Sequence, residues 1–346
     1  MSVEVVIATP LEDELVERIR REVIEVTVHH APALLPPTRF SCDHRGDPKF
    51  RRDEGSEKRW WEHLARGDVF FGIPGDTPEG LAEAVRRCPR LSWVQATSAG
   101  AGEQVRGAAL RSDELERVRV TSAAGVHAGP LAEFAIFGLL AFAKDLPRLR
   151  RDQESRRWDH YPMRELTGRT VVVLGIGGIG LEVARLAKAF GMHVIGVKRV
   201  PDAAPYVDEM YDMSALPDLA PQADAIVSTL PATGQTIGLL SRGLLSTLRR
   251  DCVLVNVGRG AVVDEEALAD ALSAGRLAGA VLDVFSTEPL PADSPLWKLE
   301  NVLMAPHTAA LSVEENRRIV SLFIDNLRRY RLGKPLRNLV DIEHFY

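Results

Sequence analysis

Residues 171–180 read Val-Val-Val-Leu-Gly-Ile-Gly-Gly-Ile-Gly and lead directly into an alanine-rich helical pattern. The apolar half predicts a buried strand, and the glycines form the GxGxxG fingerprint, which has weight only between a strand and a helix. In such a turn the first glycine permits the tight bend, the second lets the backbone approach a pyrophosphate, and the third packs closely on the strand. The helix start offers free amide groups and a positive dipole end to phosphates. The expected contacts come from Gly175, Gly177, Gly178, Ile179 and Gly180.

Short apolar runs alternate with helical patterns on both sides of this turn. Downstream of it, strands are expected at His193–Val197, Ala225–Thr229, Cys252–Asn256, Leu277–Phe285 and Asn301–Ala305. Upstream, strands are expected at Val3–Ala8, Val23–Val28, Asp68–Ile73, Leu91–Thr97 and Val118–Ser122. Such alternation predicts βαβ units in mostly parallel sheets, which is the α/β class.

The length and one long helical stretch predict two domains. A chain of 346 residues is about two domains long. The stretch Leu131–Arg157, interrupted at Pro147, lies between the two series of strands. We therefore expect one domain from residues 1–125 plus 311–346 and a second from residues 126–310.

Composition excludes several classes of protein. Lys and Arg number 43 against 48 Asp and Glu, a net charge of −5, which argues against a nucleic-acid partner. The longest apolar stretch, residues 131–143, is shorter than the roughly 20 residues that a membrane span needs, and the N-terminus does not resemble a signal peptide. Cys42, Cys88 and Cys252 are scattered, which is typical of a reducing compartment and of a chain without a zinc cluster. We expect a cytoplasmic protein that binds neither nucleic acid, membrane nor metal.

The residues after the second strand of the nucleotide unit bear on cofactor choice. An acidic residue at this place would bind a ribose 2′-hydroxyl, whereas a cation accommodates a 2′-phosphate. Here His193–Val197 is followed by Lys198 and Arg199. This favours NADP, with NAD as the other candidate. The alternative interpretation is a solvated strand end with two incidental charges.

Three later strands each end in a chemically active side chain. Arg259, Glu288 and His307 follow the strands expected near residues 252–256, 277–285 and 301–305. Ligands of open α/β sheets bind outside the carboxyl ends of the strands. Arginine holds carboxylates with two parallel hydrogen bonds, and a carboxylate beside an imidazole favours the protonated imidazole. Each residue taken singly has a structural alternative. Arg259 could be a surface arginine in a glycine turn, and Glu288 and His307 could form a loop salt bridge and a capped strand end.

Residues 169–310 resemble the D-isomer-specific 2-hydroxyacid dehydrogenases. The motifs GIGGIG, VNVGRGAVVDEEAL, LDVFSTEPLP and APHTAA occur in this order and at family-like spacing. The resemblance implies two doubly wound parallel-sheet lobes, a flavodoxin-like substrate domain and a Rossmann cofactor domain. It also implies that Arg259 binds the substrate carboxylate, that His307 is the acid/base and contacts the substrate, and that Glu288 is its partner.

The resemblance assigns further residues. Beside the cofactor it places Leu230, Pro231, Thr233, Val257 and Asp283, the last at the nicotinamide carboxamide. For the substrate carboxylate it implies the backbone of Ser98, Ala99 and Gly100, where an ordinary small-residue turn is the alternative. It implies reversible reduction of small 2-keto acids to D-2-hydroxy acids by a homodimer formed through the cofactor domain. A cofactor-sensing binding protein of the same fold, without significant turnover, is the alternative, and the segment 36–56 leaves substrate choice open.

Overall fold

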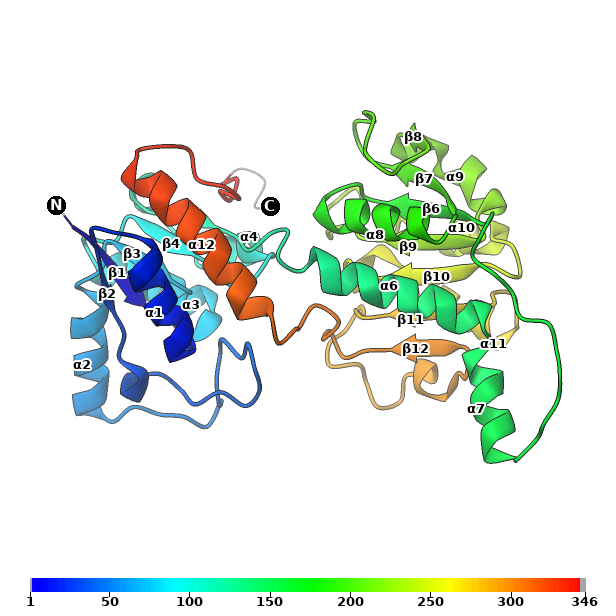
Figure 1. The fold of residues 1–346 in the computed structure, drawn as a ribbon, viewed down its shortest axis with the longest axis horizontal. Coiled ribbons are helices and arrows are strands. Elements are labelled where there is room, and N and C mark those ends of the chain that lie inside the picture. Colours follow the sequence, from blue (N-terminus) through cyan, green and yellow to red (C-terminus); the bar gives the residue numbers. More distant parts are fainter. Residues whose placement is uncertain (1, 343–346) are drawn as a thin grey trace. The chain divides into compact units, whose positions relative to one another are not determined.

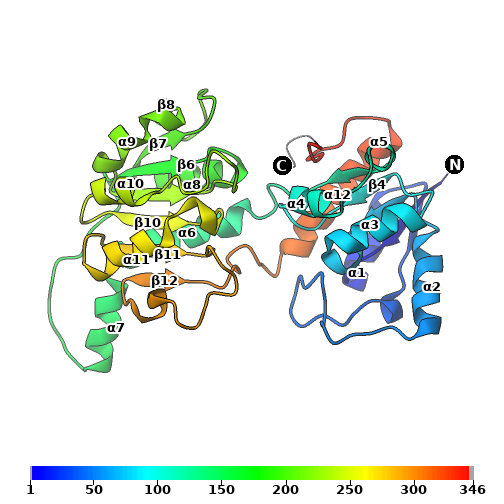
Figure 2. The ribbon, with the colours of Figure 1, turned by 180° about the vertical axis from the view of Figure 1, so that it is seen from behind.

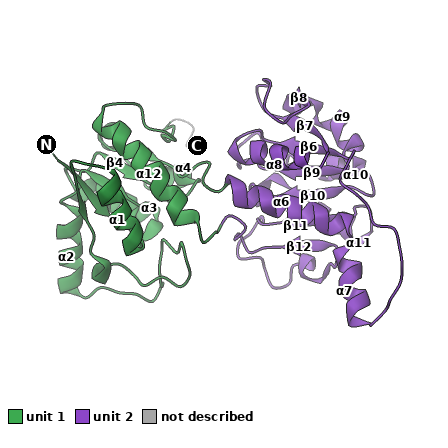
Figure 3. Ribbon diagram, viewed as in Figure 1, with its two compact units in different colours: residues 1–127, 311–346 green, residues 128–310 purple. Residues whose placement is uncertain are grey.

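The computed structural model describes residues 2–342, which form two compact units. Unit 1 contains residues 1–127 and 311–346, and unit 2 contains residues 128–310 (Figure 3). Each unit is one sheet flanked by helices, and every strand pairing within the sheets is parallel. These two sheets confirm the expected α/β class.

Unit 1 has five strands in the order β2-β1-β3-β4-β5. The strands are β1 (Val3–Ile7), β2 (Val26–His29), β3 (Val69–Phe71), β4 (Trp93–Gln95) and β5 (Arg119–Thr121). The helices are α1 (Asp13–Glu22), α2 (Glu54–Leu64), α3 (Pro78–Arg87), α4 (Ala101–Gly107), α5 (Ser112–Arg117) and α12 (Glu315–Arg331), with 3₁₀ turns at Pro32–Leu34 and Pro74–Asp76.

Apolar side chains cover both faces of this sheet. Helices α1 and α12 lie on one face of the sheet (Figure 1) and bury Ile19 and Phe323 there. The Phe323 ring centroid lies 5.3 Å from that of Trp93 on β4. On the other face α2 and α3 bury Trp60 and Leu81. The strands are buried on both sides, as parallel strands between helices are expected to be.

Unit 2 has seven strands in the order β12-β11-β10-β9-β6-β7-β8. The strands are β6 (Thr170–Leu174), β7 (His193–Val197), β8 (Glu209–Tyr211), β9 (Ala225–Ser228), β10 (Val253–Asn256), β11 (Gly279–Leu282) and β12 (Val302–Met304). The helices are α6 (Ala128–Ala143), α7 (Leu146–Glu154), α8 (Gly178–Ala189), α9 (Leu216–Leu219), α10 (Arg242–Thr247) and α11 (Glu265–Ser273). Turns of 3₁₀ helix lie at Met213–Ala215, Ala220–Gln222, Gly260–Val262 and Pro295–Lys298.

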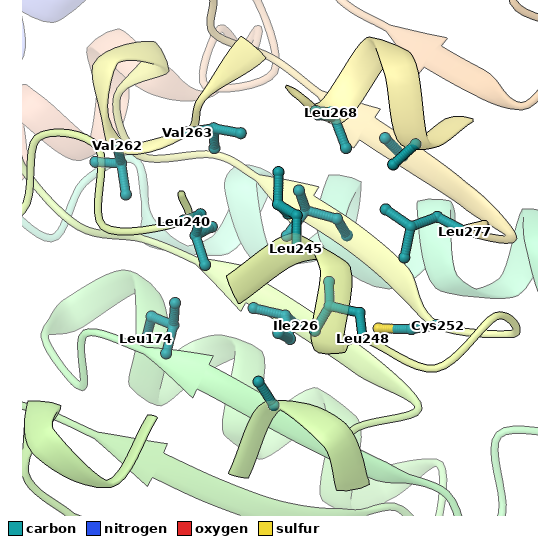
Figure 4. Close-up of a cluster of buried hydrophobic side chains, with 14 of the residues drawn as sticks. Leu174, Ile226, Leu240, Leu245, Leu248, Cys252, Val262, Val263, Leu268 and Leu277 are labelled. Carbon is teal, nitrogen blue, oxygen red and sulfur yellow. The ribbon is translucent and has the colours of Figure 1, made fainter. Parts of the chain in front are cut away.

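Two apolar clusters hold the helices of unit 2 against its sheet. Helices α6 and α8 cover one face, seen in front in Figure 1. Helices α9, α10 and α11 cover the other, seen in front in Figure 2, through side chains such as Leu245 and Leu268 (Figure 4). With both faces covered, the loops at the strand ends are left to bind ligands.

The structure corrects several element boundaries. Helix α1 continues to Glu22, so that the second strand covers Val26–His29 and not Val23–Val28. Helix α2 begins at Glu54 because the Asp53 side chain accepts a hydrogen bond from Ser56 N and caps the helix. The long helical stretch breaks before Pro147, at Asp145, whose φ is +53°.

The short strand β8 was not expected from the sequence. The three cysteines are buried and unpaired by disulfides. Within residues 2–342, no helix combines the length and apolar character that crossing a bilayer requires.

Gly138 and Gly129, both on α6, allow a matched test of this packing. A Cβ at residue 138 would lie 2.4 Å from Cγ2 of Val281 on β11, whereas a Cβ at residue 129 would meet nothing within 4 Å. Alanine in a helix is favoured over glycine by about 1 kcal/mol, yet overpacking costs about 1–3 kcal/mol. We expect Gly138→Ala to lower, and Gly129→Ala to maintain or raise, the free energy of unfolding in denaturant titrations. Equal effects of the two substitutions would contradict the close packing of α6 on β11.

Candidate active site

The glycine turn after β6 has the geometry that a dinucleotide requires. Gly175 has a φ of +91°, a conformation that side-chain-bearing residues rarely adopt. A Cβ on Gly180 would lie 1.9 Å from Gly175 O, so that only glycine allows this contact between helix and strand. A Cβ on Gly177 would meet no protein atom within 4 Å. The space beside Gly177, at the start of the twelve-residue helix α8, therefore fits a pyrophosphate.

The loop after β9 closes one side of this turn. The Thr229 hydroxyl donates to Gly175 O at 2.7 Å, a contact that sequence reasoning missed because threonine is common at strand ends. Leu230 follows, and its Cδ2 would be 3.1 Å from a Cβ on Gly175. Pro231 and Thr233 lie further along this loop, where Thr233 N donates to the hydroxyl of Thr236 at 2.8 Å.

Both basic residues that were expected to bear on the cofactor lie at the end of β7. Strand β7 pairs with β6, the strand that leads into the glycine turn. Lys198 is half-buried and forms an ion pair with Asp202. Arg199 is exposed. The Lys198 ammonium lowers the pKa of the Asp202 carboxyl, and this acid four residues after the lysine was missed by sequence reasoning.

The turn that carries Arg259 is held by backbone contacts on both sides. Asn256, at the end of β10, donates from Nδ2 to Arg259 O at 3.0 Å and accepts from Gly258 N at 3.2 Å. A Cβ on Gly258 would lie 2.5 Å from Leu230 O, and one on Gly260 would lie 1.9 Å from Phe285 C. The turn is thus fixed between the loop after β9 and the loop after β11. The expected cofactor residue Val257 is buried within this turn.

Glu288 and His307, from the loops after β11 and β12, form a hydrogen-bonded pair. His307 Nδ1 is 2.8 Å from Glu288 Oε2. The other carboxylate oxygen accepts from Phe285 N at 3.0 Å, which holds the carboxylate in place. The two side chains are 47% and 36% exposed for His307 and Glu288, respectively, so the imidazole can exchange protons with a ligand or with solvent. Because Nδ1 faces the carboxylate, the ring presents Nε2 on its opposite edge.

Asp283 accepts hydrogen bonds from the backbone of the loop that carries His307. Its Oδ1 accepts from Thr308 N and Ala309 N, both at 2.9 Å, and its backbone carbonyl accepts from His307 N at 2.9 Å. Burial raises the pKa of Asp283, although these amides act against that shift. These contacts fix the backbone of the loop that carries His307.

The segment expected to bind a carboxylate lies in unit 1, after β4. Ser98 O accepts from Ala123 N at 2.9 Å, and Ser98 Oγ donates to Gln104 Oε1 at 3.4 Å. Ala99 is exposed, and Gly100 immediately precedes α4. These residues therefore lie at the carboxyl end of their own sheet, as the others do in unit 2.

Comparisons with known proteins identify the family. The sequence pattern described as "D-isomer specific 2-hydroxyacid dehydrogenase, NAD binding domain" matches residues 136–309. A glyoxylate reductase of Korarchaeum cryptofilum (strain OPF8) is 34% identical over 269 residues, which cover 76% of this chain and 80% of that relative.

Two crystal structures share the whole fold. A D-isomer specific 2-hydroxyacid dehydrogenase family protein from Aeromonas salmonicida subsp. salmonicida A449 is 29% identical, with a TM-score of 0.77 and 99% of each chain covered. The D-isomer specific 2-hydroxyacid dehydrogenase from Xanthobacter autotrophicus Py2, in complex with NADPH and MES, is 29% identical, with a TM-score of 0.76 over 100% of this chain and 99% of that one. This chain belongs to the D-isomer specific 2-hydroxyacid dehydrogenase family, and it is an oxidoreductase with a Rossmann domain for a nicotinamide cofactor.

Proposed function

We propose that the protein reduces small 2-keto acids to D-2-hydroxy acids with a reduced nicotinamide cofactor. The observation that carries this proposal is the Glu288–His307 pair, at the same sheet edge as the GxGxxG turn. That edge thus carries both a proton donor and a phosphate-binding helix start. Glyoxylate reductases among the relatives support a substrate of this class.

The residues of the site have distinct roles in this reaction. A reduced nicotinamide held at the GxGxxG turn would supply hydride for the C2 carbon of the keto acid. His307 donates a proton from Nε2 to the C2 oxygen as negative charge develops there. Glu288, held by Phe285 N, fixes the orientation of the ring through its contact with Nδ1. Arg259 holds the substrate carboxylate with two hydrogen bonds. Its turn is fixed against the loop that carries Glu288.

The substrate carboxylate has a second expected contact in unit 1. The backbone amides of Ser98, Ala99 and Gly100 point to this role by their place at the end of β4. The candidate substrates of this class are glyoxylate, hydroxypyruvate and bulkier 2-keto acids.

The preferred cofactor in this proposal is NADPH. Lys198 and Arg199 offer cationic donors beside the strand end where the adenosine ribose binds in such units. A 2′-phosphate would take over Lys198 from Asp202, an exchange of one anionic partner for another of higher charge. The complex of the Xanthobacter relative with NADPH supports this preference.

We also propose a homodimer formed through unit 2. Trp158 is 89% exposed, and Met163 and Leu149 nearby in sequence are also exposed. Apolar side chains of this size gain about 1.5–3 kcal/mol each when they leave water. A second copy that covers the segment around α7 would supply that burial.

The acid role of His307 is tested by substitution. His307→Ala should lower kcat for keto-acid reduction by roughly 10²–10⁴, the usual effect of a positioned acid, while the Kd for NADPH stays unchanged. His193→Ala is the matched control, because His193 also pairs with a carboxylate, Glu209, at 2.9 Å, but lies at the amino end of β7. The assay follows absorbance at 340 nm over a panel of 2-keto acids. Absence of turnover in the unmodified protein across that panel would favour a cofactor-sensing binding protein.

The cofactor preference is tested by reversing the charge at the end of β7. One charge-assisted contact of about 1.5–3 kcal/mol predicts a preference for NADPH of roughly 10- to 150-fold in kcat/KM. Lys198→Asp with Arg199→Ser should shift it toward NADH. The control, Arg276→Asp with Arg250→Ser, changes the net charge equally at the opposite edge of the sheet. A preference for NADH in the unmodified enzyme would show that Lys198 and Arg199 are only a solvated strand end.

The dimer is tested through the exposed indole. Trp158→Ser should raise the dimer dissociation constant about 10-fold or more in sedimentation velocity, in line with the burial of one large side chain. Trp297→Ser is the control, since Trp297 is another exposed tryptophan of unit 2, whose Nε1 bonds to Pro291 O. A monomeric unmodified protein at micromolar concentration, or equal effects of the two substitutions, would contradict this interface.

A further inference from the structure

The chain passes between the two units twice, and a buried cluster in unit 1 lies where it leaves and returns. It leaves unit 1 after His127 and returns at Leu311. Glu315 is the first residue of α12, four residues after the return. His307, the proposed acid, lies four residues before that return.

Glu315 contacts both the departing chain and the segment 36–56. Its Oε1 is 3.2 Å from Nε2 of His127 and 3.7 Å from Nε2 of His44. All three side chains are buried, and Glu315 is only 3% exposed. The first distance permits a hydrogen bond, whereas the second leaves His44 to act through its charge.

Neighbouring contacts fix the same chain segments. Cys42 Sγ donates to Ser312 O at 3.1 Å, and Asn316 Nδ2 donates to Glu12 at 2.9 Å. The Thr9 hydroxyl donates to His44 O at 2.7 Å. The cluster therefore joins the first crossing, the second crossing and the segment 36–56 within unit 1.

The buried charge of this cluster is not explained by a contribution to folding stability. Burial by itself would raise the pKa of Glu315, but hydrogen bonding to His127 and the charges of His127 and His44 outweigh it and lower the pKa to about 2. Among the described residues, Glu315 Oε2, Asn316 Oδ1 and both His44 ring nitrogens have no hydrogen-bond partner. A buried ion pair with unused polar atoms contributes no more to stability than well-packed apolar side chains do. What such a pair does supply is a defined geometry.

We propose that Glu315 is a positioning residue for the reaction, which fixes through His127 and His44 the two chain segments that connect the units. This rests on the proposed function, because it gives unit 1 the substrate contacts and unit 2 the hydride and the acid. A displacement of about 1 Å between reacting groups costs up to roughly 100-fold in rate. The constraint should therefore appear in kcat and not in cofactor affinity.

Two buried glutamates of unit 1 make a matched pair for the test. Glu114 is also 3% exposed, but it caps α5 and accepts from Arg111 N at 2.9 Å, away from both crossings. We expect Glu315→Gln to lower kcat at least 10-fold with the Kd for NADPH within twofold, and Glu315→Asp to recover part of the loss. Glu114→Gln should lower the melting temperature but leave kcat within twofold. Equal losses of kcat in both glutamine variants, or none in Glu315→Gln, would overturn the proposal.

Hydrogen exchange separates this proposal from the proposed function. In the full chain without substrate, Glu315→Gln should speed amide exchange in peptides spanning residues 125–130 and 308–314, and Glu114→Gln should not. His127→Gln should give the same pattern, and the double variant should be no worse than either single one, because the two residues act as a unit. Unchanged exchange in these peptides would overturn the positioning role even if turnover is normal. Absence of turnover with faster exchange would instead contradict only the proposed function.

Discussion

The contact of backbone with backbone at four glycines is the constraint on which the site in unit 2 depends. Gly180 touches Gly175 O, Gly258 touches the loop after β9, and Gly260 touches the loop after β11. Any side chain at these positions would separate loops that carry the phosphate-binding turn, Arg259 and Glu288. The carboxyl ends of parallel strands lie at one edge of the sheet. The close contacts at these glycines bring the loops at that edge together.

The sequence predicts those parts of the site in which the functional residues lie next to their strand in the chain. The apolar run 170–174, the GxGxxG turn and the strand ends before Arg259 and His307 each combine a strand with the residues next to it, and the structure has all of them. The short strand β8 was missed because its three residues alternate too briefly to show a period. The charged residues before Glu57 resemble a loop in sequence, yet α2 begins at Glu54, because the Asp53 cap shows only in the folded contacts.

Some contacts could not be predicted from the sequence because they depend on tertiary packing. His127 and Glu315 are separated by 188 positions, and neither belongs to a motif with chemical meaning. The pairing of Lys198 with Asp202 is close in sequence, yet a turn of unknown shape decides whether they meet. In both cases the residue types are visible in the sequence, but their partners depend on tertiary packing.

The Glu288–His307 pair and the Glu315–His127 pair differ in exposure, and this difference fits the different roles proposed for them. Glu288 and His307 are open to solvent, so that in the proposed reaction the imidazole is accessible to both substrate and water. Glu315 and His127 are buried, so loss of either side chain would leave the polar group of the other without its partner in an apolar surrounding. A buried pair of this kind holds its two chain segments in one position. We therefore expect the exposed Glu288–His307 pair to serve proton transfer and the buried Glu315–His127 pair to hold chain geometry.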